Sequence, residues 1–139
     1  MGTIVIRSAE AYITATGQMH SGDLVLVDGR VATEADAHPD ATVIDAQGCI
    51  VTPGLVNAHH HLLQSAFRTL PGTRGVPMRA WLPTMAEAYA RAGVDPELAG
   101  IAAHIGVAEG LLCGVTTVAD HHLTWPRGAD TVGIARATA

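Results

Sequence analysis

The sequence predicts an α/β fold, in which a small antiparallel β unit precedes alternating strands and helices. Three observations support this prediction. The first fifty residues alternate polar and apolar side chains with the period of two that marks β-strands. Residues 95–114 carry the signals of a long helix, and a β-branched run follows at residues 115–120. The composition agrees, because 48% of the 139 residues are hydrophobic and only 4% are aromatic, which suits closely packed layers.

A β-hairpin is predicted within the N-terminal region. The dipeptide Asp28-Gly29 separates two extended runs, Asp23–Val27 and Arg30–Thr33, and it supplies the positive φ angles that a type I′ turn needs. Two more short strands are predicted at Thr42–Asp45 and Cys49–Thr52. We therefore expect residues 1–52 to form one antiparallel β unit.

Strands alternate with helices after Pro53. A short apolar run ends at three consecutive histidines, His59–His61, and residues 62–70 fit the start of a helix. Residues 73–83 resemble a loop, because Gly75, Pro77 and Pro83 interrupt any long period. Strands that alternate with helices pair in parallel, and functional groups gather at their carboxyl ends.

The clearest predicted helix covers residues 96–112. Asp95 is its expected N-cap, Pro96 takes the first helical position, and Gly114 follows its end. Apolar residues recur in it at steps of three and four, and we expect the face that they form to be buried. These residues are Leu98, Ile101, Ala102, Ile105, Ala108 and Leu112. The next strand ends in Asp120-His121-His122, and a last helix is predicted to open at residue 130.

Charge and hydropathy exclude several classes of partner. The formal net charge is -5, and the eight lysines and arginines are scattered, so that no basic patch recruits nucleic acid or anionic lipid. The N-terminus lacks the pattern of a signal peptide, and no run approaches the roughly 20 apolar residues of a membrane span. We expect a soluble cytoplasmic protein with neither nucleic-acid nor membrane partners.

The three consecutive histidines suggest a metal site. On a strand, His59 and His61 point to one side and His60 to the other. Two neutral imidazoles that converge suit a divalent cation such as Zn²⁺, which binds histidine nitrogen at about 2.0–2.1 Å. The alternative is a polar rim whose rings bond to backbone or water. A tag remnant is disfavoured, because the histidines are internal and embedded in apolar sequence.

Two segments carry a resemblance to a known family. "VTPGLVNAHHHL" is similar to the first barrel strand of the amidohydrolase superfamily, whose motif reads Pro-Gly-Leu/Phe-Ile/Val-Asn/Asp-x-His-x-His, and "GVTTVADHHL" resembles its second strand. The resemblance implies the beginning of a (β/α)8 TIM-type barrel over residues 53–139, incomplete in this chain, preceded by a small antiparallel β-sandwich unit over residues 1–52. Within the superfamily, "NAHHHLLQSAFRTLPG", Trp81-Leu82 and "ADHHL" most resemble the 8-oxoguanine deaminases, followed by the s-triazine hydrolases.

The resemblance assigns roles to particular residues. It implies that His59 and His61 bind a divalent metal, most simply Zn²⁺, with Fe²⁺ as the alternative. The residues it places near substrate are Gln64, Trp81, His121 and His122, and Asp120 is expected to orient a histidine. Other interpretations stay open for four of these residues. Gln64 also fits a surface position, Trp81 also fits packing under the loop, and the two histidines also fit supporting or capping roles.

The implied activity is metal-dependent hydrolysis of carbon-nitrogen bonds other than peptide bonds. The expected reaction is hydrolytic deamination of an aminated heterocycle, such as 8-oxoguanine or an s-triazine, by a complete enzyme that is a homo-oligomer. The family's third histidine ligand, later histidine, aspartate and general-acid glutamate have no counterparts here, so we expect an N-terminal fragment that is inactive or incomplete alone and contains no general acid or base. The alternatives are an amidohydrolase that opens a cyclic amide and a non-catalytic binding or structural remnant.

Overall fold

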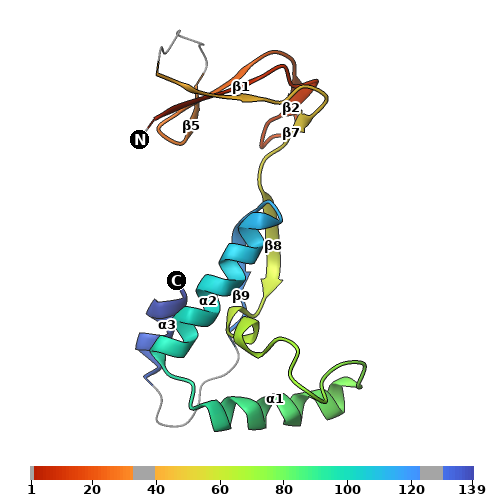
Figure 1. The fold of residues 1–139 in the computed structure, drawn as a ribbon, viewed down its shortest axis with the longest axis vertical. Helices are drawn as coiled ribbons and strands as arrows, with labels where there is room; N and C mark the ends of the chain where they lie inside the picture. Colours follow the sequence, from red (N-terminus) through yellow and green to blue (C-terminus); the bar gives the residue numbers. More distant parts are fainter. Residues whose placement is uncertain (1, 33–39, 123–129) are drawn as a thin grey trace. The chain divides into compact units, whose positions relative to one another are not determined.

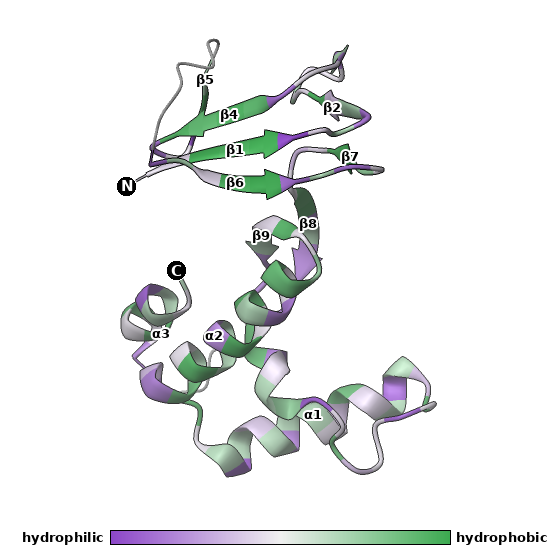
Figure 2. Cartoon of the chain, turned by 45° about the horizontal axis from the view of Figure 1, so that its top comes forward, coloured by the Kyte–Doolittle hydropathy of each residue, from purple (hydrophilic) through white to green (hydrophobic). Residues whose placement is uncertain are grey.

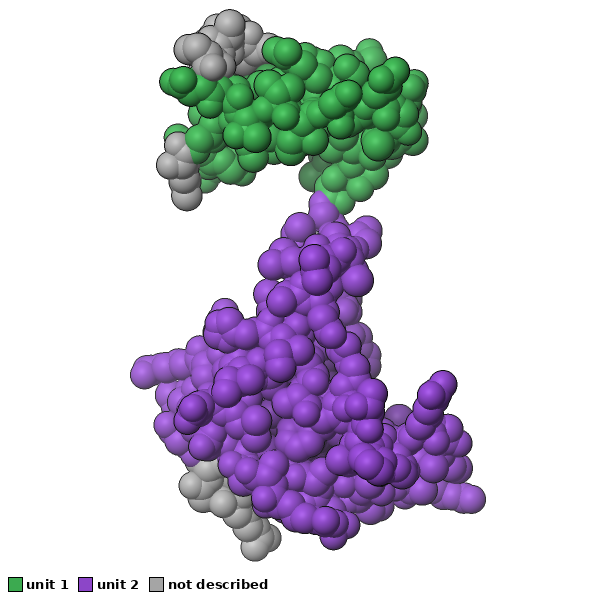
Figure 3. Space-filling model, viewed as in Figure 1, with its two compact units in different colours: residues 1–53 green, residues 54–139 purple. Residues whose placement is uncertain are grey.

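The structure, a computed structural model, describes residues 2–32, 40–122 and 130–139. The chain divides into two compact units, residues 1–53 and 54–139 (Figure 3). Cys49 and Cys113 are both exposed free thiols. Within the described ranges, no helix combines the length and the apolarity that crossing a bilayer would require.

Two small sheets make up the first unit (Figure 1). The four-stranded sheet has the order β5-β4-β1-β6, and the three-stranded sheet has the order β3-β2-β7. The bounds are β1 Thr3–Arg7, β2 Ala11–Ile13, β3 Met19–His20, β4 Leu24–Val27, β5 Arg30–Ala32, β6 Thr42–Asp45 and β7 Ile50–Val51. The unit buries four small apolar residues: Val5, Ala11, Val25 and Ala46.

The predicted hairpin is confirmed. β4 pairs with β5 in antiparallel register, with Val27 opposite Arg30. The two turn residues between them have positive φ angles, 48° at Asp28 and 78° at Gly29, as a type I′ turn requires. Local sequence chemistry therefore determines this part of the sheet.

The prediction of a wholly antiparallel unit is wrong. β6 lies parallel to β1, and β7 lies parallel to β2, so that each sheet is mixed. Polar and apolar alternation specifies which face of a strand is buried, but it does not specify the partner strand or its direction. The hairpin was predictable because its two strands are joined by a two-residue turn, whereas β1 and β6 are far apart in the sequence.

The second unit contains two parallel strands and the helices that follow them. Its elements are β8 Leu55–His60, the 3₁₀ helix η1 Leu62–Phe67, α1 Met78–Ala92, α2 Pro96–Leu112, β9 Val115–Asp120 and α3 Thr131–Thr138. β8 pairs with β9 in parallel, as the alternation of strands and helices predicts. The carboxyl ends of the two strands therefore meet at one edge.

The helix predicted at residues 96–112 begins and ends where its capping residues indicate. The Asp95 side chain accepts a hydrogen bond of 2.8 Å from the Leu98 N–H. Gly114, just after the helix, has a φ of 79°, a conformation that glycine adopts without strain.

The prediction of a loop at residues 73–83 is wrong for residues 78–83, which are helical. α1 begins at Met78, directly after Pro77, and contains Pro83 in its second turn. A proline inside a helix lacks the N–H that would bond to the carbonyl four residues earlier, so it disfavours the helix locally. The helix forms nevertheless, because its next two turns bury Met85 and Tyr89.

The face of α2 that is buried also differs from the prediction. Its buried residues are all small: Ala99, Ala102, Ala103 and Gly106. Of the predicted residues, Ala102 is buried and Leu98 is partly buried, but Ile101 is 52%, Ile105 42% and Leu112 89% exposed. Figure 2 shows hydrophobic residues, in green, in successive turns of α2. η1 and α3 pack on α2, and small side chains allow such elements to approach closely. Helical periodicity finds an apolar face, but α2 is apolar on more than one side.

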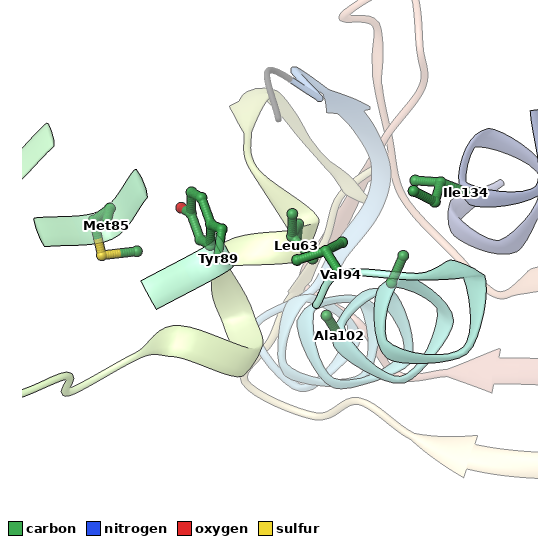
Figure 4. Close-up of a cluster of buried hydrophobic side chains, with 7 residues drawn as sticks. Leu63, Met85, Tyr89, Val94, Ala102 and Ile134 are labelled. Carbon is green, nitrogen blue, oxygen red and sulfur yellow. The ribbon is translucent and has the colours of Figure 1, made fainter. Parts of the chain in front are cut away.

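A cluster of buried side chains joins η1 to the helices (Figure 4). Tyr89 of α1 meets Phe67 of η1 edge to face, with ring centroids 4.8 Å apart. The cluster consists of Leu63, Met85, Tyr89, Val94, Ala99, Ala102 and Ile134. It fixes η1, the segment that directly follows the three histidines, against α1, α2 and α3.

Candidate metal centre

Two imidazoles meet at the carboxyl end of β8. The Nε2 atoms of His59 and His61 lie 3.2 Å apart. Two histidine nitrogens bound to one tetrahedral Zn²⁺ at 2.0–2.1 Å would be about 3.3 Å apart. The separation of the two nitrogens therefore matches that of two ligands of one divalent cation.

The hydrogen bond at the other ring nitrogen of His61 defines its tautomer. His61 Nδ1 lies 2.5 Å from the backbone carbonyl oxygen of His121. A carbonyl oxygen only accepts hydrogen bonds, so Nδ1 is the atom that carries the proton. In the neutral ring, Nε2 then keeps a lone pair directed at His59. A histidine ligand is oriented in this way when its second nitrogen donates to a backbone carbonyl.

His60 is turned toward the scaffold. A Cβ atom built on Gly106 of α2 would lie 3.6 Å from the Cε1 atom of His60. Its Nδ1 atom is buried and has no hydrogen-bond partner among the described residues. His60 therefore lies against α2, while its two neighbours face each other.

The residues at the end of β9 bind the backbone around β8. The Asp120 carboxylate accepts a 2.9 Å hydrogen bond from the Leu62 N–H. The backbone N–H of His121 donates to the His60 carbonyl at 2.7 Å. The Nε2 atom of the His121 ring lies 3.1 Å from the Ala58 carbonyl oxygen. Since this oxygen accepts, His121 Nε2 donates and is not available as a ligand.

His121 and His122 differ in their ring contacts. The ring of His121 flanks that of His59, with centroids 4.5 Å apart. His122 lies next to Asp120 instead, with Nδ1 3.7 Å from a carboxylate oxygen. Across the part of the chain that the structure describes, no group of three or more histidine, cysteine or acidic residues is placed to hold a metal. The imidazoles of His59 and His61 thus lie together as a pair, and neither of the two histidines that follow β9 completes a three-ligand group with them.

An open hollow lies beside the histidine pair. Its volume is about 640 Å³, within the range of small-molecule sites. Its lining includes His59, His61, Gln64 of η1, Trp81 of α1, and Arg68, which directly follows η1. Trp81 is half-buried, and it both lines the hollow and packs against the hydrophobic cluster. The hollow is large enough for a flat heterocycle next to the imidazoles.

Tyr89 and Arg68 were not singled out from the sequence. Burial raises the pKa of the Tyr89 hydroxyl, and the neighbouring Gln64 side chain partly opposes this rise. Gln64 and Tyr89 line the same small hollow. The spacing of Trp81, Met85 and Tyr89, four residues at each step, was the signal that could have revealed this face of α1. Arg68 pairs with Glu109 of α2 at 2.5 Å.

A pair of imidazoles at the carboxyl end of a parallel strand, beside a hollow of this size, is an arrangement typical of metal-dependent α/β enzymes. The amidohydrolase family model matches residues 50–138. The chain belongs to the amidohydrolase family.

Curated relatives include several deaminases. The chain is 39% identical over 130 residues to the 8-oxoguanine deaminase of Pseudomonas aeruginosa, a match that covers 90% of this chain and 28% of that protein. It is 37% identical over 135 residues to the 5-methylthioadenosine/S-adenosylhomocysteine deaminase 2 of Archaeoglobus fulgidus, covering 96% of this chain and 31% of the relative. The chain thus spans less than a third of the length of these relatives.

Solved structures agree with this relationship. The atrazine chlorohydrolase of Arthrobacter aurescens TC1, complexed with zinc, aligns with a TM-score of 0.74 and 33% identity. The alignment covers 97% of this chain and 32% of that chain.

Proposed function

We propose that the chain supplies two metal ligands, His59 and His61, to a hydrolase that deaminates an aminated heterocycle. The observation that carries this proposal is the 3.2 Å separation of the two Nε2 atoms, together with the Nδ1 contact that leaves His61 Nε2 unprotonated. The names of the deaminase relatives and the zinc of the chlorohydrolase structure support deamination and Zn²⁺. We propose 8-oxoguanine or an s-triazine as the substrate class.

The fold context of the proposal is a barrel. We propose that β8 and β9 correspond to the first two strands of a (β/α)8 barrel. The β unit of residues 1–53, with its mixed sheets, precedes them in the sequence. The parallel pairing of β8 with β9 supports this, as does the match of the chlorohydrolase to 97% of the chain. The histidines would then occupy the end of the barrel where such enzymes have their active sites.

The chain's own residues suit the task of holding a flat, polar ring. When bound, Zn²⁺ activates water at neutral pH. The Gln64 amide both donates and accepts hydrogen bonds, which matches the edge of an aminated heterocycle. Trp81 offers an apolar wall, and Arg68 adds a cation at the rim of the hollow. Asp120 supports the segment indirectly, because its carboxylate holds the Leu62 N–H next to His61.

Activity is best tested in a chimera. This chain would replace the matching segment of the Pseudomonas aeruginosa deaminase, and ammonia release from 8-oxoguanine and from aminated s-triazines would be measured. An active chimera that loses activity with His59→Ala supports the proposal. Ring opening of cyclic amides without ammonia would favour the alternative hydrolase.

The chain alone provides a separate test of the metal site. Zinc titration of the purified chain, followed by elemental analysis, should detect binding that disappears in His61→Ala. A well-folded chain that binds no divalent metal would favour a non-catalytic module and would contradict the proposal.

A further inference from the structure

Gly106 of α2 lies directly against η1. A Cβ atom built on this glycine would lie 2.6 Å from the Ser65 hydroxyl oxygen and 2.9 Å from the Leu62 Cδ2 atom. Both distances are shorter than carbon atoms tolerate in non-bonded contact. Neither neighbour has solvent to move into, because Leu62 is 2% and Ser65 9% exposed. The present distance between α2 and η1 therefore depends on the absence of a side chain at position 106.

The residues that meet Gly106 are sequence neighbours of two residues of the candidate site. Leu62 directly follows His61, and Ser65 directly follows Gln64. The opposite side of the same segment is held by β9, through the His60 carbonyl at 2.7 Å and the Leu62 N–H at 2.9 Å. The turn from β8 into η1 is thus fixed between β9 and α2. A side chain added on this face of α2 would therefore displace this turn, which contains His61 and leads into Gln64.

We propose that Gly106 is a positioning residue that sets the direction of the His61 ring and the Gln64 amide. It acts at a distance from the hollow, by allowing η1 to rest directly on the backbone of α2. The inference rests on the proposed metal role of His59 and His61. A side chain at position 106 would displace the turn and misdirect His61 Nε2 from its shared centre with His59.

α2 contains two glycines that serve as matched controls. A Cβ on Gly100 would lie 3.5 and 3.6 Å from two atoms of Ala137, and a Cβ on Gly110 would lie 3.6 Å from the nearest atom of Val115. These are ordinary van der Waals distances. All three glycines are helical, so alanine should improve helix propensity similarly at each, by about 1 kcal/mol. Only position 106 combines this gain with a clash.

The experiment compares Gly106→Ala with Gly100→Ala in the whole 139-residue chain. Zinc affinity should fall about 10–100-fold in Gly106→Ala, as it does when a supporting contact of a ligand is lost. Gly100→Ala should bind zinc like the unaltered chain. In the metal-free protein, the His61 ring and Leu62 amide resonances should shift in Gly106→Ala alone, which a uniform loss of stability would not produce.

A second substitution tests whether the contact with Ser65 is the cause. Ser65→Ala removes the hydroxyl oxygen nearest to the added methyl group but leaves the 2.9 Å approach to Leu62 Cδ2, so Gly106→Ala/Ser65→Ala should regain part of the lost affinity. If Gly106→Ala does not fold, this double variant decides. A folded double variant that binds zinc supports the proposal, and one that stays unfolded overturns it.

Failure of the inference can be separated from failure of the proposed function. An unaltered chain that binds no zinc contradicts the proposed function, and the metal-free resonances then decide the role of Gly106. If Gly106→Ala matches Gly100→Ala in both zinc affinity and resonances, Gly106 does not position the turn.

Discussion

The carboxyl ends of β8 and β9 carry similar residues and use them differently. Consecutive histidines lie at the end of β8 and directly after β9, and the two ends meet at one edge of the parallel pair. At β8, the Nε2 atoms of His59 and His61 face each other beside an open hollow. At β9, the Asp120 carboxylate and the His121 ring and carbonyl contact the backbone and the His61 ring. The β8 end presents two ring nitrogens to each other, and the β9 end holds the backbone and the His61 ring through hydrogen bonds.

This difference shows that a histidine cluster at a strand end does not by itself define a metal site. What separates the two ends is the partner of each ring nitrogen. His61 donates from Nδ1 and keeps Nε2 available, whereas His121 donates from Nε2 to the Ala58 carbonyl. The predictions below test this division of roles.

Removing a β8 imidazole should have the largest effect on metal binding. We expect His59→Ala or His61→Ala to weaken zinc binding by more than the roughly 10–100-fold that loss of a supporting contact costs. His59 is exposed, so its replacement should change the free energy of unfolding by no more than about 0.5 kcal/mol. Isothermal titration and urea denaturation measure the two quantities. His104→Ala, an exposed position on α2, is the control, and equal zinc loss there would contradict the assignment.

Removing the Asp120 carboxylate should affect stability more than any other change at the β9 end. Asp120→Ala leaves the partly buried Leu62 N–H without its acceptor, which should cost about 1.5–3 kcal/mol of unfolding free energy. Asp120→Asn keeps an acceptor oxygen and should cost clearly less. Hydrogen exchange at the Leu62 amide checks this directly. Unchanged exchange in Asp120→Ala would show that the carboxylate does not hold this turn.

Replacing His121 should produce a smaller change. His121→Ala loses the 3.1 Å contact with the Ala58 carbonyl and the ring beside His59, but it keeps the backbone carbonyl that binds His61. We expect a loss of about 1 kcal/mol in unfolding free energy. Zinc affinity should fall less than in His61→Ala. A loss of zinc equal to that of His61→Ala would make His121 a ligand and would contradict the comparison.

The smallest expected effect is the pH dependence of stability that arises from Tyr89, which lines one small hollow with Gln64 and residues of both strand ends. Burial raises the pKa of Tyr89 above 10.0, so the unfolded chain releases this proton first as the pH rises. Ionisation of Tyr89 should therefore make no pH-dependent contribution to the free energy of unfolding below about pH 10. Above that, the free energy of unfolding should fall as the pH rises to the pKa of the folded state.

Urea denaturation across this pH range provides the measurement for Tyr89. Tyr89→Phe should remove this part of the decline. Tyr12→Phe, which replaces the other tyrosine of the chain, is the matched control. A decline that Tyr12→Phe removes as fully as Tyr89→Phe would not arise from Tyr89.

Local signals in the sequence were sufficient for several elements. Asp28-Gly29 located the hairpin, and Asp95 with Pro96 located the start of α2, because turn and capping chemistry depends on a few neighbouring residues. The period of two along β8 also separated His60 from its neighbours. These features require no knowledge of distant contacts.

Features that depend on distant contacts were not predictable in this way. The parallel partners of β6 and β7 and the buried face of α2 are set by packing between remote segments. The same holds at the site. That Gln64 meets Tyr89, and that the His121 carbonyl sets the tautomer of His61, follows only from the pairing of β8 with β9 and the packing of α1.

The most direct test of the account follows the histidine ring nitrogens during a zinc titration by long-range ¹H–¹⁵N NMR. We expect the Nε2 resonances of His59 and His61 to shift together and saturate at one zinc per chain, while the Nε2 resonance of His121 retains the signature of a protonated nitrogen. Saturable shifts at His121 or His122 in place of the β8 pair would contradict it.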